Sequence, residues 1–192
     1  MVEGDARERF TEVEAGSHDL LVTSPPYLNS FDYSDVYRPE MFLGGFVRNN
    51  AELREIRLKT IRSHVQVSWE PAEAMASDLL LPVLGRLEHE TLWDKRIPAM
   101  VRSYFVDMAS VLKEAHRIIR PGGEAWILVS TSAYGGVHVP VDLILADVAT
   151  HNGWDLTGVY VLRQMRAAGQ QWGRVGTSSS PPLRESLILL KR

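Results

Sequence analysis

Two consecutive prolines directly after an apolar run are the strongest constraint on how this chain folds. Residues 18–27 read HDLLVTSPPY, so a hydrophobic strand meets Ser24-Pro25-Pro26-Tyr27. Proline has a fixed φ and no backbone N–H, so the strand must end there and the next turn is stiff. The Pro25 carbonyl and the Ser24 hydroxyl can then accept both hydrogens of an amino group, and Tyr27 offers a flat face to a planar base. The alternative is a Pro-Pro turn that only caps a strand, beside a tyrosine of the core.

A second Ser-Pro-Pro triplet provides an internal comparison. Residues 180–183 read SPPL, but they follow the polar run 176–179 instead of an apolar strand, and Leu183 stands where the first copy has an aromatic residue. We interpret the second copy as a plain loop and the first as functional.

The sequence resembles the S-adenosylmethionine-dependent DNA amino-methyltransferases. Their catalytic tetrapeptide is Asp/Asn/Ser-Pro-Pro-Tyr, and TSPPY is the form most often seen in the cytosine-N4 branch. Four further stretches resemble the family: VEGDARERF, YLNSFDYSDVYRPEMFLGGF, LREIRLKTIRSHVQVSW and PLRESLILLKR. The resemblance implies that Ser24, Pro25, Pro26 and Tyr27 are catalytic, and that the substrate is a flipped base of DNA, N4 of cytosine before N6 of adenine.

The same resemblance implies which residues contact S-adenosylmethionine. They are Asp5, Thr23 and Ser24, with Asp5 at the family position that contacts the adenine amino group of the cofactor. Asp5 is equally consistent with an ordinary N-cap for the helix that follows it.

Charge is uneven along a chain whose net charge is −3. Residues 48–64 carry five Lys/Arg against two Glu, so we predict that Arg54, Arg57, Arg62 and His64 contact DNA phosphates. Gln170 lies in the polar and aromatic loop 169–173 and is a further candidate for DNA contact. The alternatives are a solvated face, a basic helix end and a surface hairpin loop.

The order of the expected elements predicts an α/β fold. We expect strands at 2–4, 19–23, 125–129, 156–162 and 186–190, and helices over 6–14, from about Pro98 to Ile119, and from Pro140 to Asn152. Residues 28–36 read as a loop and 37–95 as several short helices. This is the second half of a doubly wound, Rossmann-like methyltransferase sheet with a final hairpin and a helical insert at 37–95, in one catalytic half-domain over 1–192.

The family that the chain resembles holds the cofactor on a Gly-rich turn after its first strand, and no such turn is found in this sequence. The first strands of the sheet are missing with it, so this half should expose a long hydrophobic edge. We expect a second polypeptide to carry the Gly-rich half and the enzyme to be an obligate heteromer. A fragment of a longer chain, or a degenerate relative without activity, are the alternatives.

Composition excludes some kinds of site. The chain has no cysteine, which removes disulfides and thiolate metal sites, and its histidines show no metal-ligand spacing. No apolar run approaches the roughly 20 residues of a membrane span, so we expect no membrane partner and a cytoplasmic location. Two other functions stay open: a non-catalytic DNA-binding or scaffolding subunit, and methylation of an RNA base or a protein amide.

Overall fold

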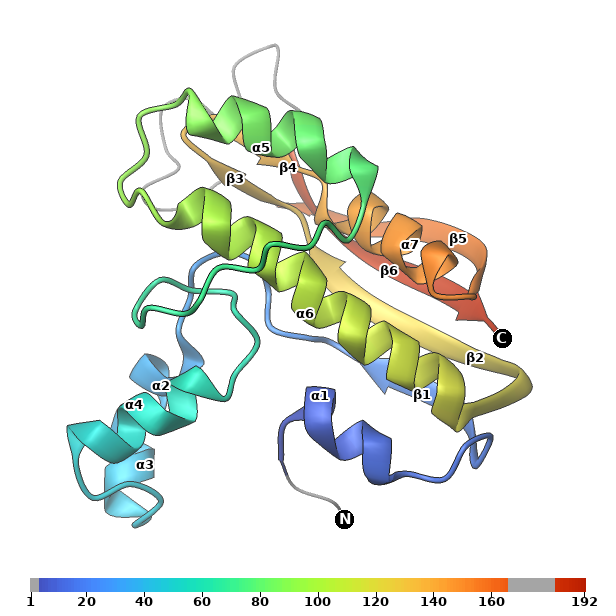
Figure 1. Cartoon of the computed structure of the whole chain (residues 1–192), viewed down its shortest axis with the longest axis horizontal. Coiled ribbons are helices and arrows are strands. Elements are labelled where there is room, and N and C mark those ends of the chain that lie inside the picture. Colours follow the sequence, from blue (N-terminus) through green and yellow to red (C-terminus); the bar gives the residue numbers. More distant parts are fainter. Residues whose placement is uncertain (1–3, 166–181) are drawn as a thin grey trace.

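A computed structural model describes residues 4–165 and 182–192, which fold around a four-stranded mixed sheet (Figure 1). The strand order is β1 (His18–Thr23), β2 (Ile119–Ser130), β6 (Leu183–Lys191) and β5 (Asp155–Met165). Strands β1 and β2 are parallel, whereas β6 runs antiparallel to both of its neighbours. The predicted α/β class and the final hairpin are confirmed.

Two long helices, α6 (Ile97–Ile118) and α7 (Val141–His151), lie on one face of this sheet (Figure 1). The apolar stripe read from the sequence is buried there, including Val101, Phe105, Met108 and Leu112. The facing side chains of β2 and β6 are buried as well: Ala125, Ile127, Val129, Ile188 and Leu190. Apolar periodicity therefore determined where the core forms.

The remaining elements are short, and those within 37–95 are the several short helices expected for the insert. They are α1 (Ala6–Arg9), η1 (Phe10–Glu12), α2 (Tyr33–Val36), α3 (Arg38–Leu43), α4 (Asn50–Leu58), η2 (Asp78–Leu80), α5 (Leu81–Glu88) and the hairpin β3 (Ser132–Tyr134) with β4 (Val137–Val139). In Figure 1, helices α2, α3 and α4 gather at one end, away from the sheet.

Local structure differs from the prediction at several points. Helix α2 replaces part of the loop predicted at 28–36, because the Asp32 side chain accepts a hydrogen bond from the Ser34 N–H and caps it. The predicted helix over 6–14 is broken into α1 and η1, and the hairpin β3–β4 was not predicted. The strand predicted at 2–4 lies largely outside the described residues, and Gly4, which is described, is not in a strand.

Strand β2 starts earlier than expected because it continues through Pro121-Gly122-Gly123. Its pairing with β1 jumps from His18 opposite Ile119 to Leu20 opposite Glu124, so the proline-glycine stretch bulges out of the ladder. Gly122 adopts φ 83° and its N–H donates to the Arg192 carbonyl. A Cβ at Gly123 would lie 2.6 Å from the Asp19 carbonyl oxygen, so only glycine allows this close approach.

The second face of the sheet carries apolar side chains that stay open to solvent. Register places Leu20, Val22, Trp126, Leu128, Tyr160, Leu187 and Leu189 on this outer face, opposite α6 and α7. Val22 is 65% exposed and Tyr160 is 51% exposed. Strand β1 forms the edge, with β2 as its only partner among the described residues. The exposed hydrophobic edge expected from the sequence is therefore present. No helix in these two ranges is long and apolar enough to cross a membrane.

Candidate active site

The tetrapeptide Ser24–Tyr27 directly follows β1 and so lies at the carboxyl end of the parallel strands β1 and β2. Thr23, the last residue of β1, pairs with Ile127, and Ser24 follows with its side chain exposed. Pro25 is buried, whereas Pro26 and Tyr27 are half-buried. In the described part of the chain no protein group donates a hydrogen bond to the Pro25 carbonyl oxygen. An exposed hydroxyl and an unengaged carbonyl thus stand one residue apart.

The chain after the tetrapeptide is fixed by hydrogen bonds. The Asn29 N–H donates to the Tyr27 carbonyl at 2.8 Å, which makes a tight turn. The carbonyl of the fully buried Leu28 accepts from the Tyr134 hydroxyl at 3.0 Å and from the Ser132 hydroxyl. Both donors belong to the hairpin strand β3, so this element holds the turn at its place.

Tyr27 is bound at its hydroxyl. It donates to Glu185 Oε1 at 3.2 Å, and Glu185 Oε2 accepts from Arg163 Nε at 2.6 Å. Burial raises the pKa of Tyr27; the nearby Ser24 side chain opposes the shift and the Glu185 carboxylate adds to it. The hydrogen bond from Arg163 lowers the pKa of Glu185, so this carboxylate is ionised at neutral pH. Sequence reasoning missed both Glu185 and Arg163. The one feature of the sequence that could have indicated Glu185 is its charge near the start of the apolar strand β6.

Asp5 is the N-cap of α1, as the alternative interpretation predicted. Its carboxylate accepts from the Arg7 N–H at 2.9 Å and from the Arg7 guanidinium. Burial pushes the pKa of Asp5 upward, but the hydrogen bonds from Arg7 outweigh it and leave the pKa below its ordinary value. Arg7 also pairs with Asp107 of α6 at 3.0 Å, and Arg62 pairs with the same carboxylate at 2.7 Å. One charge network therefore joins a predicted cofactor residue to a predicted DNA residue.

The predicted basic segment does not form one solvated face. Arg57 belongs to α4 and reaches the first turn of α2, where it pairs with the N-cap Asp32 at 2.6 Å and also with Asp35. Arg62 is held by Asp107, whereas Arg54 is exposed on α4 and has no charged partner among the described residues. A phosphate contact by Arg57 or Arg62 would have to compete with these carboxylates.

Two further candidates for DNA contact remain. His64 is 3% exposed, and burial lowers its pKa, so its ring is neutral at pH 7 despite Asp32 nearby. Gln170 lies outside the described residues, as does most of the second Ser-Pro-Pro triplet. The DNA-binding role of all these side chains stays a prediction.

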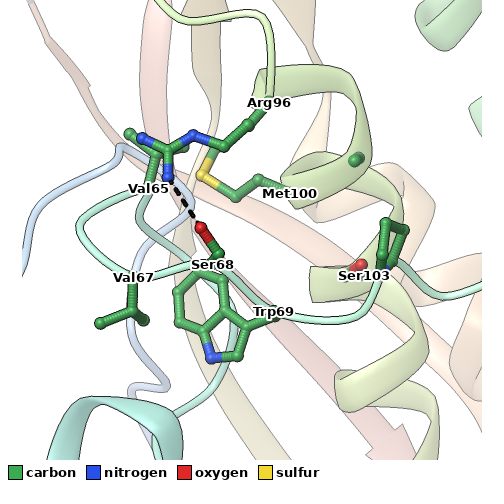
Figure 2. Close-up of a pocket in the computed structure, with 9 residues that line it drawn as sticks. Val65, Val67, Ser68, Trp69, Arg96, Met100 and Ser103 are labelled. Carbon is green, nitrogen blue, oxygen red and sulfur yellow. Dashed lines mark hydrogen bonds between the residues drawn. The ribbon is translucent and has the colours of Figure 1, made fainter. Parts of the chain in front are cut away.

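A small cavity of about 80 Å³ opens between segment 65–71 and the first turns of α6 (Figure 2). Trp69 and Met100 form its apolar wall, and Arg96 reaches across to the Ser68 hydroxyl at 3.5 Å. None of the site residues predicted from the sequence lines it. Within residues 4–165 and 182–192, no group of three acidic or histidine side chains is placed to hold a metal ion.

No model of a known protein family matches the chain, but its curated relatives include two Type II methyltransferases. Type II methyltransferase M.AvaI of Nostoc sp. is 29% identical over an alignment of 192 positions. This alignment covers 94% of this chain and 39% of that protein. Type II methyltransferase M.BsoBI of Geobacillus stearothermophilus is 23% identical and is matched over 100% of this chain and 42% of its own length. The chain thus spans about two fifths of the length of these relatives.

Solved structures of TTHA0409, a candidate DNA modification methylase from Thermus thermophilus, share the fold. One matches with a TM-score of 0.50 and 17% identity over 98% of this chain and 52% of that chain. Another, complexed with S-adenosyl-L-methionine, matches with a TM-score of 0.50 and 15% identity over 98% of this chain and 53% of that chain. Over nearly its whole length, the chain is therefore similar in sequence to about two fifths of each of these Type II methyltransferases.

Proposed function

We propose that this chain is the catalytic part of an S-adenosylmethionine-dependent DNA methyltransferase that acts on an exocyclic amine, N4 of cytosine before N6 of adenine. The observation that carries the proposal is that two hydrogen-bond acceptors of the tetrapeptide are available to a substrate. Ser24 is exposed directly after β1, and the Pro25 carbonyl accepts no hydrogen bond within the described residues. Two acceptors at the carboxyl end of a strand suit a group that carries two N–H hydrogens.

The chemistry follows from these two acceptors. An exocyclic amine is a poor nucleophile because its lone pair is delocalised into the ring. Hydrogen bonds to Ser24 Oγ and to the Pro25 carbonyl favour a pyramidal nitrogen, which returns the lone pair to that atom. The half-buried ring of Tyr27 holds the flipped base by stacking. Positioning by a stiff turn that the protein has already organised then supplies most of the rate.

S-adenosylmethionine supplies an electrophilic methyl group on a positively charged sulfur. Thr23, Ser24 and Asp5 are the residues of this chain that we assign to it, and their fit is partial. Ser24 is open, but the Asp5 carboxylate already accepts from Arg7, so it can hold an adenine amino group only alongside that side chain. No glycine-rich turn joins a strand to a helix within 4–165 and 182–192. We assign the rest of the pocket to a partner.

The uncovered side of the sheet supports a partner polypeptide. Sheets of this class normally have helices on both faces, whereas here the outer face and the edge of β1 are open. An exposed apolar edge strand is a template for pairing with another strand. The curated relatives also contain a further part, about three fifths of their length, that this chain does not match. We therefore propose a second polypeptide that adds strands beside β1 and covers the outer face.

Methyl transfer with the co-purified partner tests the proposal. DNA incubated with S-adenosylmethionine is digested, and its nucleosides are analysed by mass spectrometry. Ser24→Ala and Tyr27→Ala should each lower turnover by about 100-fold, since each removes an organised contact at the reacting group. Ser110→Ala, which removes an exposed hydroxyl on α6, is the matched control and should leave turnover unchanged.

Each other outcome identifies a different function. Methylated adenine in place of cytosine would change the target base, and methyl groups only on RNA or protein would change the substrate class. DNA binding without any product would leave a non-catalytic subunit. Near wild-type turnover of Tyr27→Ala would remove the stacking role.

A further inference from the structure

Glu185 lies beside the Ser24–Tyr27 tetrapeptide, although it is 158 residues from Tyr27 in sequence. In the sheet it pairs with Ser130, the last residue of β2, and with Arg163 of β5. This register places Glu185 at the end of the sheet where β1 delivers the tetrapeptide. It lies on the outer face, because its side chain alternates with those of its neighbours Arg184 and Ser186.

Those neighbours are bound to the helix side of the sheet. Arg184 Nε and the Ser186 hydroxyl both donate to Oδ2 of Asp142, at 2.7 Å and 2.6 Å. Asp142 belongs to α7 and is fully buried. The Arg184 N–H also donates to Thr131 Oγ1 at 2.9 Å. The backbone on both sides of Glu185 is thus anchored, which fixes where its carboxylate stands.

The two oxygens of the Glu185 carboxylate accept hydrogen bonds from two different side chains. Arg163 Nε binds Oε2 at 2.6 Å, and the Tyr27 hydroxyl binds Oε1 at 3.2 Å. Arg163 belongs to the neighbouring strand and lies directly opposite in register, so it sets the plane of the carboxylate. Tyr27, whose ring is proposed to stack on the base, is therefore held at its hydroxyl by Glu185.

We propose that Glu185 is a positioning residue, which holds the Tyr27 hydroxyl so that the tyrosine ring stays oriented to receive the flipped base. The role rests on the proposed methyl transfer and adds a residue that acts only through Tyr27. A phenol ring fixed at one end needs no ordering when the base arrives, so the hydrogen bond contributes to the rate by preorganisation. Glu185 itself makes no contact with the reacting amine.

A double-mutant cycle in the assembled enzyme tests this role. Glu185→Ala removes the acceptor, Tyr27→Phe removes the hydroxyl but keeps the ring, and the double variant removes both. Each single change should lower kcat by about 10-fold, and the double variant should be no slower than either, because both changes break one contact. Glu114→Ala is the matched control. Glu114 accepts from Arg117 Nε at 2.8 Å on α6, away from the site, and its loss should leave kcat unchanged.

A second readout does not depend on activity. In the isolated chain carrying ¹³C-labelled tyrosine, NMR titration reports the pKa of Tyr27, with its signal assigned by its absence in Tyr27→Phe. The Glu185 carboxylate raises this pKa, so Glu185→Gln should lower it.

Three results would overturn the inference. An unchanged Tyr27 pKa in Glu185→Gln would mean that the contact does not form. A shifted pKa with unchanged kcat would mean that the contact does not orient the base. An equal loss of kcat in the wild-type and Tyr27→Phe backgrounds would mean that Glu185 acts elsewhere. If the wild-type enzyme transfers no methyl group, the proposed function fails instead, while the pKa measurement still decides whether Glu185 holds Tyr27.

Discussion

Val22 offers the sharpest test of the proposed assembly. It is the second-to-last residue of β1, and its side chain on the outer face is 65% exposed. In the isolated chain, Val22→Lys puts a charge on a surface that already meets water, and the lysine stem can stay on the sheet. Surface substitutions of this kind usually change the free energy of unfolding by about 0.5 kcal/mol or less. We therefore expect a nearly unchanged melting temperature for the isolated chain.

The same substitution should be severe once the partner binds. Complete burial of a valine side chain contributes about 1.5–3 kcal/mol, so the 65% that is still exposed corresponds to about 1–2 kcal/mol. The Val22→Lys variant lacks this burial energy. It also places an unpaired charge in an apolar interface, at a further cost of several kcal/mol. Since about 1.4 kcal/mol changes affinity tenfold, association should weaken by about 100-fold or more.

Thermal denaturation and sedimentation velocity measure the two effects separately. Val129→Ala is the control, because Val129 is fully buried against the helices. It should lower the free energy of unfolding by about 1.5–3 kcal/mol without changing the interface. Partner binding by Val22→Lys at wild-type affinity would refute the assembly proposed here. Destabilisation of the isolated chain as large as that of Val129→Ala would show that the outer face is already covered.

Two further predictions concern charge. Arg54→Glu should weaken DNA binding and reduce the slope of log affinity against log salt by about 1 without loss of stability; an unchanged slope would mean that Arg54 contacts no phosphate. Arg62→Glu should instead destabilise the fold by about 1.5–3 kcal/mol in denaturant titration, because it removes the charged hydrogen bonds to the buried Asp107 and leaves only Arg7 to pair with it. The third concerns pH: burial raises the pKa of Asp142, but hydrogen bonds from Arg184 and Ser186 outweigh it and leave the folded pKa below the ordinary 3.8. Its contribution to stability is therefore complete above that value and is lost as pH falls through the lower folded pKa. Asp142→Asn should flatten the fall in melting temperature in this acid range, and an unchanged acid curve would assign it to other carboxylates.

Local sequence determined most of the elements. The strand that ends at Ser24 is set by two prolines that cannot continue a ladder, and α6 is set by apolar side chains repeating at three and four residues. The final antiparallel pair follows from two apolar runs at the end of the chain. The tetrapeptide could be singled out for the same reason, since its four residues are contiguous and directly follow an apolar strand.

Tertiary structure decided which charged side chains remain free. Arg54, Arg57 and Arg62 look alike in sequence, but only the fold brings Asp32 to Arg57 and Asp107 to Arg62. A guanidinium pairs with whichever carboxylate packing places within reach, and for Arg62 that carboxylate is 45 residues away. No local pattern contains this information.

The contact between Glu185 and Tyr27 depends on the fold in the same way. Which residue of β6 stands opposite the end of β2 is set by register, and a shift by one residue would turn Glu185 to the other face. The sequence by itself therefore determined the Ser-Pro-Pro-Tyr turn and the elements that carry it. Only the packed sheet decided what holds Tyr27, because strand pairing brings together residues that lie far apart along the chain.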